Sequence, residues 1–269
     1  ESSCDTDHAD MKFISSRDNV RLKSLRALAE DTREQRRRNS TVLDGPHLVE
    51  AYFRQVGSPE LVAISESGRD HMEIRELLAG FSGEILCFKD SLFREISGTA
   101  SPVGIAAVIM IPAESSLPTQ GDCIVLDAIQ DAGNLGSILR SAAAAGVQDV
   151  VVGPGCAGPW TPRVLRAGQG AHFALNIREQ DDLVGFIQAF PGQSIATVVC
   201  GAASLFGADL QPRSAWVFGS EGRGVSPEIE AACQHRITIP LASNSESLNV
   251  AAAAAVCLFE TVRQKKSQG

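Results

Sequence analysis

Ile239-Pro-Leu-Ala-Ser-Asn-Ser-Glu-Ser-Leu-Asn-Val-Ala-Ala-Ala253 joins a short apolar segment to an alanine-rich one. Pro240 has no N–H to donate, so a β-strand is expected to end there. The alanine-rich part is expected to be a helix with Ser245 or Ser247 as its N-cap and Glu246 at its positive end. By itself the segment is either an ordinary strand-to-helix turn or a ligand-binding loop on a rigid scaffold.

A second segment has the same order of apolar strand, polar loop and helix. After the apolar run 123–128 comes a polar turn and then Asn134-Leu-Gly-Ser-Ile-Leu-Arg140. Asn134 is predicted to be the N-cap of the helix and Gly146 its left-handed end. Arg140 falls on the polar face, so it points either to solvent or into a cleft at the carboxyl edge of the sheet.

A third segment, Gly219-Ser-Glu-Gly-Arg-Gly-Val-Ser-Pro-Glu228, follows the apolar run 214–218. Its glycines let backbone N–H groups approach a ligand closely. Ser226 and Pro227 then favour a helix start. Glu221 lies inside this glycine loop, either as a surface turn residue or as a carboxylate with a partner.

The whole chain alternates strand-like and helix-like segments in two halves. Leu22, Leu25 and Leu28 mark an amphipathic helix in the first half, and a second helix is entered through Asp44-Gly45-Pro46, with the proline in its first turn. The other segments predicted from the pattern are a helix at 70–79 and strands at 61–64, 84–88, 103–111, 123–128, 149–152, 194–200, 214–218 and 236–239. Apolar strands separated by helices predict an α/β fold with a mostly parallel sheet covered on both faces. The expected domains are 12–111 and 122–269, with a proline-bounded linker at 112–121.

Composition excludes several classes of protein. The 269 residues are 44% hydrophobic, but no apolar run is long enough to span a membrane. Residues 1–10 lack the pattern of a secretory signal and are expected to be an extension before a start at Met11. The seven cysteines are widely spaced, which predicts reduced thiols in a cytoplasmic protein. The histidines and cysteines form no metal-binding spacing, so no metal is expected.

The net charge of −8 hides a basic segment. Residues 12–38 hold nine basic and four acidic residues, a local charge of +5. Such a segment either binds a phosphate backbone or forms a solvated helix face. The residues that would contact such a backbone are Arg17, Arg21, Lys23, Arg36, Arg37 and Arg38.

Gly153-Pro-Gly-Cys-Ala-Gly158 matches the spacing of a dinucleotide-binding loop. That loop requires a helix to begin at once, and Pro159 and Pro162 argue against one here. A nicotinamide-dependent oxidoreductase is therefore the weaker alternative.

Together the three segments resemble the SpoU/TrmH branch of the SPOUT RNA 2′-O-ribose methyltransferases. Asn134–Arg140 is similar to the first motif of that family, Val217–Gly224 to the second, and Ile239–Ala251 to the third. Val164–Ala171 matches the segment usually found between the first two. Residues 12–111 resemble the family's L30e-like substrate-binding domain. The run Pro154–Pro162 is richer in glycine and proline than the family pattern, which leaves substrate selection there open.

The resemblance implies an α/β sheet with a C-terminal trefoil knot, S-adenosylmethionine as cofactor and a homodimer formed through the catalytic domain. The positions that match the family's cofactor contacts are Gly219, Ile239 and Leu248, with Cys200 and Gly201 nearby. Arg140 is implied as the catalytic arginine that positions the ribose hydroxyl. Asn134, Glu221, Ser247 and Asn249 are implied to orient that arginine and the substrate.

The implied substrate is structured RNA, with ribosomal RNA first and transfer RNA second. A noncatalytic RNA-binding relative with the same fold is the remaining alternative. The intact residues Asn134, Arg140, Glu221 and Asn249 favour the enzyme.

Overall fold

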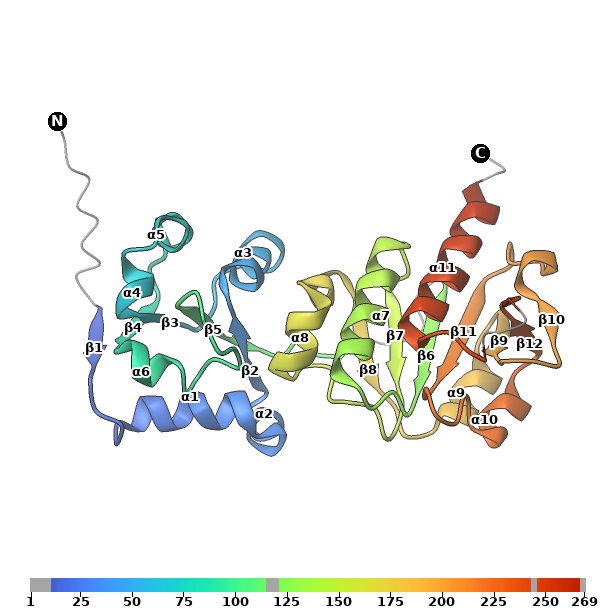
Figure 1. Cartoon of the computed structure of the whole chain (residues 1–269), viewed down its shortest axis with the longest axis horizontal. Coiled ribbons are helices and arrows are strands. Elements are labelled where there is room, and N and C mark those ends of the chain that lie inside the picture. The colour runs from blue at the N-terminus through green and yellow to red at the C-terminus, as the bar shows by residue number, and fades with distance from the viewer. Residues whose placement is uncertain (1–10, 115–120, 243–245, 267–269) are drawn as a thin grey trace. The chain divides into compact units, whose positions relative to one another are not determined.

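The computed structural model describes residues 11–114, 121–242 and 246–266, and it divides into two compact units (Figure 1). The first unit holds the described residues up to Pro112 together with Trp160–Arg166, and the second unit holds the rest. The expected extension at 1–10, most of the expected linker and the candidate N-cap Ser245 lie outside the described residues.

The first unit contains a five-stranded mixed sheet in the order β1-β4-β3-β5-β2. Its strands are β1 (Lys12–Ile14), β2 (Ser40–Asp44), β3 (Leu61–Ser65), β4 (Glu84–Phe88) and β5 (Ile105–Met110). β1, β4 and β3 are parallel, whereas β5 is antiparallel to both of its neighbours. The helices are α1 (Val20–Glu30), α2 (Thr32–Arg38), α3 (Pro46–Gln55), α4 (Glu66–Arg69), α5 (Met72–Leu78), α6 (Asp90–Phe93) and the start of α8 (Pro162–Gly168).

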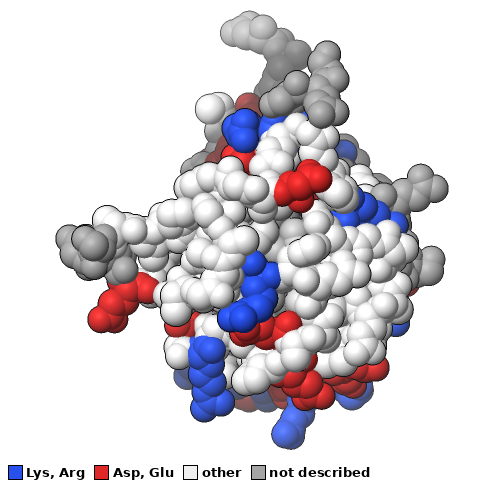
Figure 2. All heavy atoms as spheres, turned by 90° about the vertical axis from the view of Figure 1, so that its right-hand side faces the viewer, with Lys and Arg blue, Asp and Glu red and all other residues white. Residues whose placement is uncertain are grey.

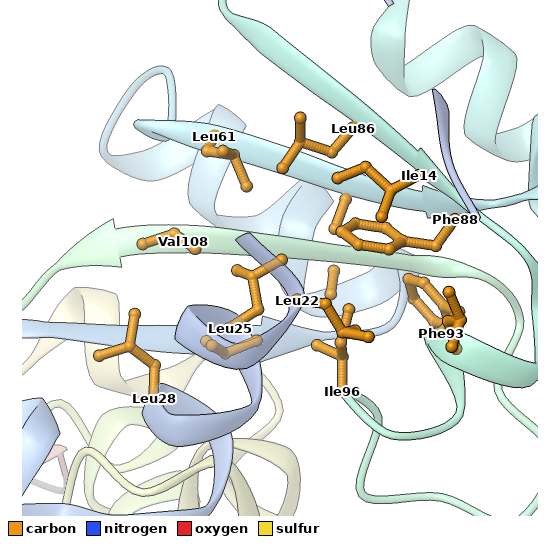
Figure 3. Close-up of a cluster of buried hydrophobic side chains, with 14 residues drawn as sticks. Ile14, Leu22, Leu25, Leu28, Leu61, Leu86, Phe88, Phe93, Ile96 and Val108 are labelled. Atoms are coloured by element: carbon orange, nitrogen blue, oxygen red, sulfur yellow. The ribbon is translucent and has the colours of Figure 1, made fainter. Parts of the chain in front are cut away.

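Helix α1 covers the sheet with the apolar stripe that the sequence predicts. Leu22, Leu25 and Leu28 are each less than 5% exposed, and Figure 3 shows them directed at Phe88 and Val108 of the sheet. Removing the side chains of α1 from water in this way stabilises the helix more than its intrinsic propensity does.

The second unit contains a seven-stranded sheet in the order β10-β12-β9-β11-β6-β7-β8, in which every neighbouring pair is parallel. Its strands are β6 (Cys123–Asp127), β7 (Asp149–Val152), β8 (Asn176–Glu179), β9 (Gln193–Thr197), β10 (Ala203–Ser204), β11 (Ser214–Gly219) and β12 (His235–Thr238). Its helices are α7 (Ala132–Ala144), α9 (Leu183–Ala189), α10 (Pro227–Ala232) and α11 (Val250–Lys266), with short 3-10 turns η1 (Ala171–Ala174) and η2 (Leu205–Gly207). The parallel sheet confirms the predicted α/β class.

Helices cover both faces of this sheet, as the alternation of side chains along β11 shows. Ala215 and Val217 pack in one buried cluster with residues of α9 and α10. Between them, Trp216 faces the other way and its indole N–H donates to Thr261 Oγ1 of α11 at 3.1 Å. Successive side chains of a strand point to opposite faces, so α11, with α7 beside it, covers the second face.

The sequence prediction matches both ends of β4 and β7, and it misses β1, β2, β8 and β10. The missed strands are short or carry polar residues, so they lack a long apolar run. The predicted helix at 70–79 is shorter in the structure, because α5 begins at Met72.

Candidate functional site

The loops that follow β6 and β11 begin side by side. Gly219, the last residue of β11, is paired in register with Asp127, the last residue of β6. Because the strands are parallel, both chains leave the sheet at its carboxyl edge, where open α/β sheets bind ligands. The loops after β9 and β12 leave at the same edge.

Three side chains form a hydrogen-bonded cluster at this edge. They come from the first turn of α7, the loop after β11 and the residue before α11. Asn134 Nδ2 donates to Glu221 Oε1 at 2.6 Å, and Asn249 Nδ2 donates to the same oxygen at 2.8 Å. Asn249 Nδ2 also lies 2.9 Å from Asn134 Oδ1. The structure therefore brings together three residues that the sequence predicts as site residues, over separations of up to 115 positions. Glu221 has partners and is not a simple turn residue.

The N-caps predicted for α7 and α11 are wrong. The residues that cap these helices in the structure leave the side-chain amides of Asn134 and Asn249 free to bind Glu221. Asp131 is the N-cap of α7, because its Oδ1 accepts from Asn134 N at 2.8 Å. Asn134 therefore lies in the first turn, and its amide is available to Glu221. At α11, Asn249 Oδ1 accepts from the N–H groups of Ala251 and Ala252, so Asn249 takes the capping role predicted for Ser247.

An apolar cavity of about 440 Å3 lies at the glycine loop. The predicted site residues that line it are Gly219, Ile239, Leu248, Cys200, Ser247 and Glu221. Gly201 is exposed beside Cys200 and has a φ of +72°, outside the cavity lining. Most of the expected cofactor contacts are thus grouped around one cavity.

Gly219 is required at its position by backbone packing. A Cβ on this residue would overlap the main-chain atoms of Gly224 and Val225. The loop folds back on itself here, since Gly224 N donates to Ser220 O at 2.8 Å. This close return leaves the turn residues at the rim of the cavity.

A second, polar cavity of about 440 Å3 adjoins the first. It is lined by Asn134 and Asp131 from the start of α7, by Ala128–Gln130, and by Ser220–Arg223. Ser220–Arg223 and Val250 also line the apolar cavity, so the glycine loop separates the two.

Arg140 does not lie in this arrangement. It is exposed on the polar face of α7, as the sequence pattern predicts, and it lies outside the lining of both cavities. Its side chain makes no hydrogen bond or ion pair with another described residue.

Two residues that the sequence prediction does not include hold the loops in place. Asp127, 8% exposed, accepts from Ser226 N at 2.7 Å and so ties the end of the glycine loop to β6. Cys156 Sγ accepts from Ile129 N at 3.2 Å, and burial raises the pKa of this thiol to about 11. The thiol therefore stays protonated and acts as a structural contact. The sequence feature that could have indicated Asp127 is its position as an acidic residue at the end of a buried strand.

The basic residues of the first unit are mostly paired with carboxylates. Arg17 contacts Glu95 at 2.8 Å, Arg21 contacts Glu84 at 3.0 Å, and Lys23 contacts Asp18 at 3.0 Å. Arg37 and Arg38 both bind Glu34, at 2.7 and 3.1 Å, and Arg36 has an interaction of its own. Glu84 and Glu95 lie outside residues 12–38, and their negative charges offset part of the +5 charge of that segment.

The loop after Gly153 does not have the form of a dinucleotide-binding loop. No helix begins directly after Gly153, since α8 starts at Pro162, so the dinucleotide-loop interpretation lacks its helix. In the described part of the chain, no group of His, Cys, Asp and Glu side chains could hold a metal ion. No helix in that part is long and apolar enough to cross a membrane. The cysteines from Cys87 to Cys257 are free thiols.

Comparison with known proteins gives the family. Residues 122–259, which include all of the clustered residues, match the model of the SpoU rRNA Methylase family. The chain belongs to this family.

A Bacillus subtilis 23S rRNA (guanosine(2553)-2′-O)-methyltransferase is 31% identical over 256 residues, which cover 93% of this chain and 98% of the relative. A solved structure named RNA 2′-O ribose methyltransferase superposes with a TM-score of 0.82 at 26% identity, over 94% of this chain and 99% of that one. The SpoU methyltransferase AviRb from Streptomyces viridochromogenes, solved with AdoMet, has a TM-score of 0.81 over 93% of this chain and 100% of its own. At 23% identity this last likeness shows the fold alone.

Proposed function

We propose that the protein transfers a methyl group from S-adenosylmethionine to a ribose 2′-hydroxyl of RNA. The observation that carries the proposal is the Asn134–Glu221–Asn249 cluster at the glycine loop between an apolar and a polar cavity. Methyl transfer needs two adjoining places, one for the donor and one for the acceptor nucleotide. The names of the relatives support the ribose hydroxyl as the acceptor.

The apolar cavity fits the cofactor. Its volume of about 440 Å3 lies in the range of small-molecule sites. Gly219 leaves the backbone accessible, Ile239 and Leu248 offer apolar contacts, and Cys200 with Gly201 forms the adjoining loop. When bound there, S-adenosylmethionine would supply an electrophilic methyl group.

The polar side chains would orient the acceptor. Glu221 fixes the amides of Asn134 and Asn249, and Ser247 adds a hydroxyl at the cavity. Arg140 would position the 2′-hydroxyl and stabilise the negative charge that develops on its oxygen. Arginine stays protonated in proteins, so this role is electrostatic and not that of a base. Alignment of the reacting groups supplies much of the rate.

A homodimer through the second unit is part of the proposal. The apolar side chains Val256 and Phe259 are 37% and 48% exposed on α11, which offers a contact surface. Arg140 lies outside the cavities of its own chain, so a partner could complete the site around it. Light scattering coupled to gel filtration measures the mass, and a monomer would contradict this part. A C-terminal trefoil knot and an L30e-like first unit accompany the family resemblance and belong to the same proposal.

Ribosomal RNA is the first substrate in this proposal and transfer RNA the second, with the cytoplasm as the location. The basic side chains Arg17, Arg21, Lys23, Arg36, Arg37 and Arg38 would contact RNA phosphates. Exposed ion pairs contribute little to stability, so the exchange of Glu34, Glu84 or Glu95 for a phosphate costs little.

Two measurements test the proposal together. Calorimetry should detect S-adenosylmethionine binding, and tritium from the labelled methyl group should enter a ribosomal RNA fraction in preference to transfer RNA. Preferential labelling of transfer RNA would move the substrate to the second choice. Absence of cofactor binding would favour a noncatalytic RNA-binding relative.

A further inference from the structure

Arg223 is a cation at the tip of the glycine loop that the site described above leaves without a role. It lies between Gly222 and Gly224, is exposed, and lines both cavities. The hydrogen bond from Gly224 N to Ser220 O closes the loop beneath it, and Gly224 takes a φ of +68°. The backbone that carries Arg223 is therefore a tight turn.

Arg223 is the basic residue in the lining of the polar cavity. Among the residues of its lining, Arg223 alone is basic, and the carboxylates are Asp131 and Glu221. Both carboxylates already accept N–H groups, from Asn134 N at 2.8 Å and from the amides of Asn134 and Asn249. No carboxylate of the described residues lies within ion-pair distance of Arg223.

Other arginines of the chain differ in this respect. Arg236, which also lines the apolar cavity, is held by Glu230 at 2.7 Å. The basic residues of the first unit are paired as described above, Arg17 with Glu95 and Arg21 with Glu84. Figure 2 shows the side of the molecule at β10 and β12, where basic and acidic side chains are interspersed among uncharged ones. An exposed arginine at a cavity rim without such a partner is available to an anion from outside the chain.

We infer that Arg223 binds a backbone phosphate of the substrate RNA next to the nucleotide that enters the polar cavity. The inference rests on the proposed function and deepens it. A nucleotide within an RNA strand brings a phosphate on each side, and the planar guanidinium can donate two parallel hydrogen bonds to it. Phosphate contacts of this kind fix the register of a nucleic acid, so Arg223 would position the target ribose beside Asn134 and Glu221.

Three variants test the inference. Arg223→Gln removes the charge, Arg223→Lys keeps it, and Arg178→Gln removes a cation of β8 that is paired with Glu114 at 3.9 Å and lies away from the glycine loop. RNA affinity is measured at several salt concentrations by equilibrium binding, together with kcat and KM for RNA and the Kd for S-adenosylmethionine.

For Arg223→Gln we expect about tenfold weaker RNA binding, and a slope of log affinity against log salt that is lower by about 1. KM for RNA should rise by a similar factor while kcat changes less than about threefold and cofactor affinity stays unchanged. Arg223→Lys should recover most of the affinity and the slope, and Arg178→Gln should behave as wild type.

An Arg223→Gln protein with wild-type RNA affinity and salt slope would overturn the inference. Weaker cofactor binding with an unchanged salt slope would also overturn it, because Arg223 would then serve the carboxylate of S-adenosylmethionine. The RNA-binding measurement does not depend on turnover. A wild-type protein that binds RNA but transfers no methyl group would therefore contradict the proposed function and still test Arg223.

Discussion

Glu221 Oε1 accepts two amide N–H groups from residues of α7 and of the loop before α11, at 2.6 and 2.8 Å. A carboxylate bonded in this way fixes which side of each amide is the donor. Asn249 has a second task, because its Oδ1 caps α11. The cluster therefore couples the geometry of the site to the stability of the last helix.

Asn249→Asp separates the two tasks of this residue. The new carboxylate keeps a capping oxygen for Ala251 N and Ala252 N, but it cannot donate to Glu221. Two neighbouring carboxylates repel, so the variant should lose activity while its free energy of unfolding falls by less than about 1 kcal/mol. Asn249→Ala loses the cap as well and should cost about 1 kcal/mol more. Calorimetric unfolding and initial rates measure both effects, and equal stability of the two variants would contradict the capping role.

Arg140→Ala tests the proposed catalytic role. Arg140 is exposed and has no partner among the described residues, so its loss should change stability by no more than about 0.5 kcal/mol. Methyl transfer should fall by a factor of about 10²–10³, the effect of removing one group that stabilises developing charge. Cofactor affinity should be unchanged. A variant with near wild-type turnover would remove Arg140 from the mechanism.

The sequence predicts the identity of the clustered residues better than their local geometry. Asn134 and Ser247 both have the side-chain type of an N-cap, yet Asp131 and Asn249 take these positions. Several polar residues near each helix start compete for the cap, and the choice depends on contacts with Glu221 from another loop. The sequence does not single out Arg223, because charged residues are common in turns. Only the structure shows that no carboxylate within the described ranges pairs with it.

At the scale of elements, the return of the glycine loop onto β11 depends on the absence of a side chain at Gly219. Overlap of a Cβ with the backbone of Gly224 and Val225 cannot be relieved by a rotamer change. The loop would have to shift, and with it the rims of both cavities.

Gly219→Ala should therefore cost about 1–3 kcal/mol of stability and weaken cofactor binding at least tenfold. Gly222→Ala is the matched comparison, because a Cβ there meets nothing within 4 Å and its φ is not positive. Its unfolding temperature should stay within a few degrees of wild type. Unfolding scans and calorimetry compare the two, and similar losses in both variants would contradict the packing argument.

The predicted strands at the centre of the second sheet agree with the structure because a strand buried on both faces is a nearly continuous apolar run. β11 and β7 are examples, with every residue buried. β8 and β10 lie at the two edges of the same sheet, where polar and exposed residues are tolerated, so composition does not reveal them. Their pairing with β7 and β12 identifies β8 and β10 as strands.

One buried histidine makes the stability of the protein depend on pH. His172, 1% exposed, has Nε2 2.9 Å from Pro159 O, and burial lowers its pKa from 6.5 to about 4. The unfolded chain binds a proton below pH 6.5 whereas the folded chain does not, so the stabilisation is complete above pH 6.5 and is lost as pH falls toward 4.

The free energy of unfolding should fall by roughly 3 kcal/mol over this window. His172→Gln should flatten the dependence between pH 6.5 and 4.5, and His47→Gln, at an exposed histidine, should leave it unchanged. Urea unfolding at a series of pH values measures the slope. A wild-type slope that persists in His172→Gln would assign it to other groups.

The arrangement of the second unit as a whole is that of the SpoU family, and the site lies where its parallel strands end. We conclude that this site methylates a ribose hydroxyl. Nucleoside mass spectrometry of ribosomal RNA incubated with the protein and S-adenosylmethionine detects the product of that reaction. We predict a 2′-O-methylated nucleoside that forms with the wild-type protein and falls with Arg140→Ala. A methyl group found on a base, or no methylated nucleoside in RNA that the protein binds, would contradict the claim.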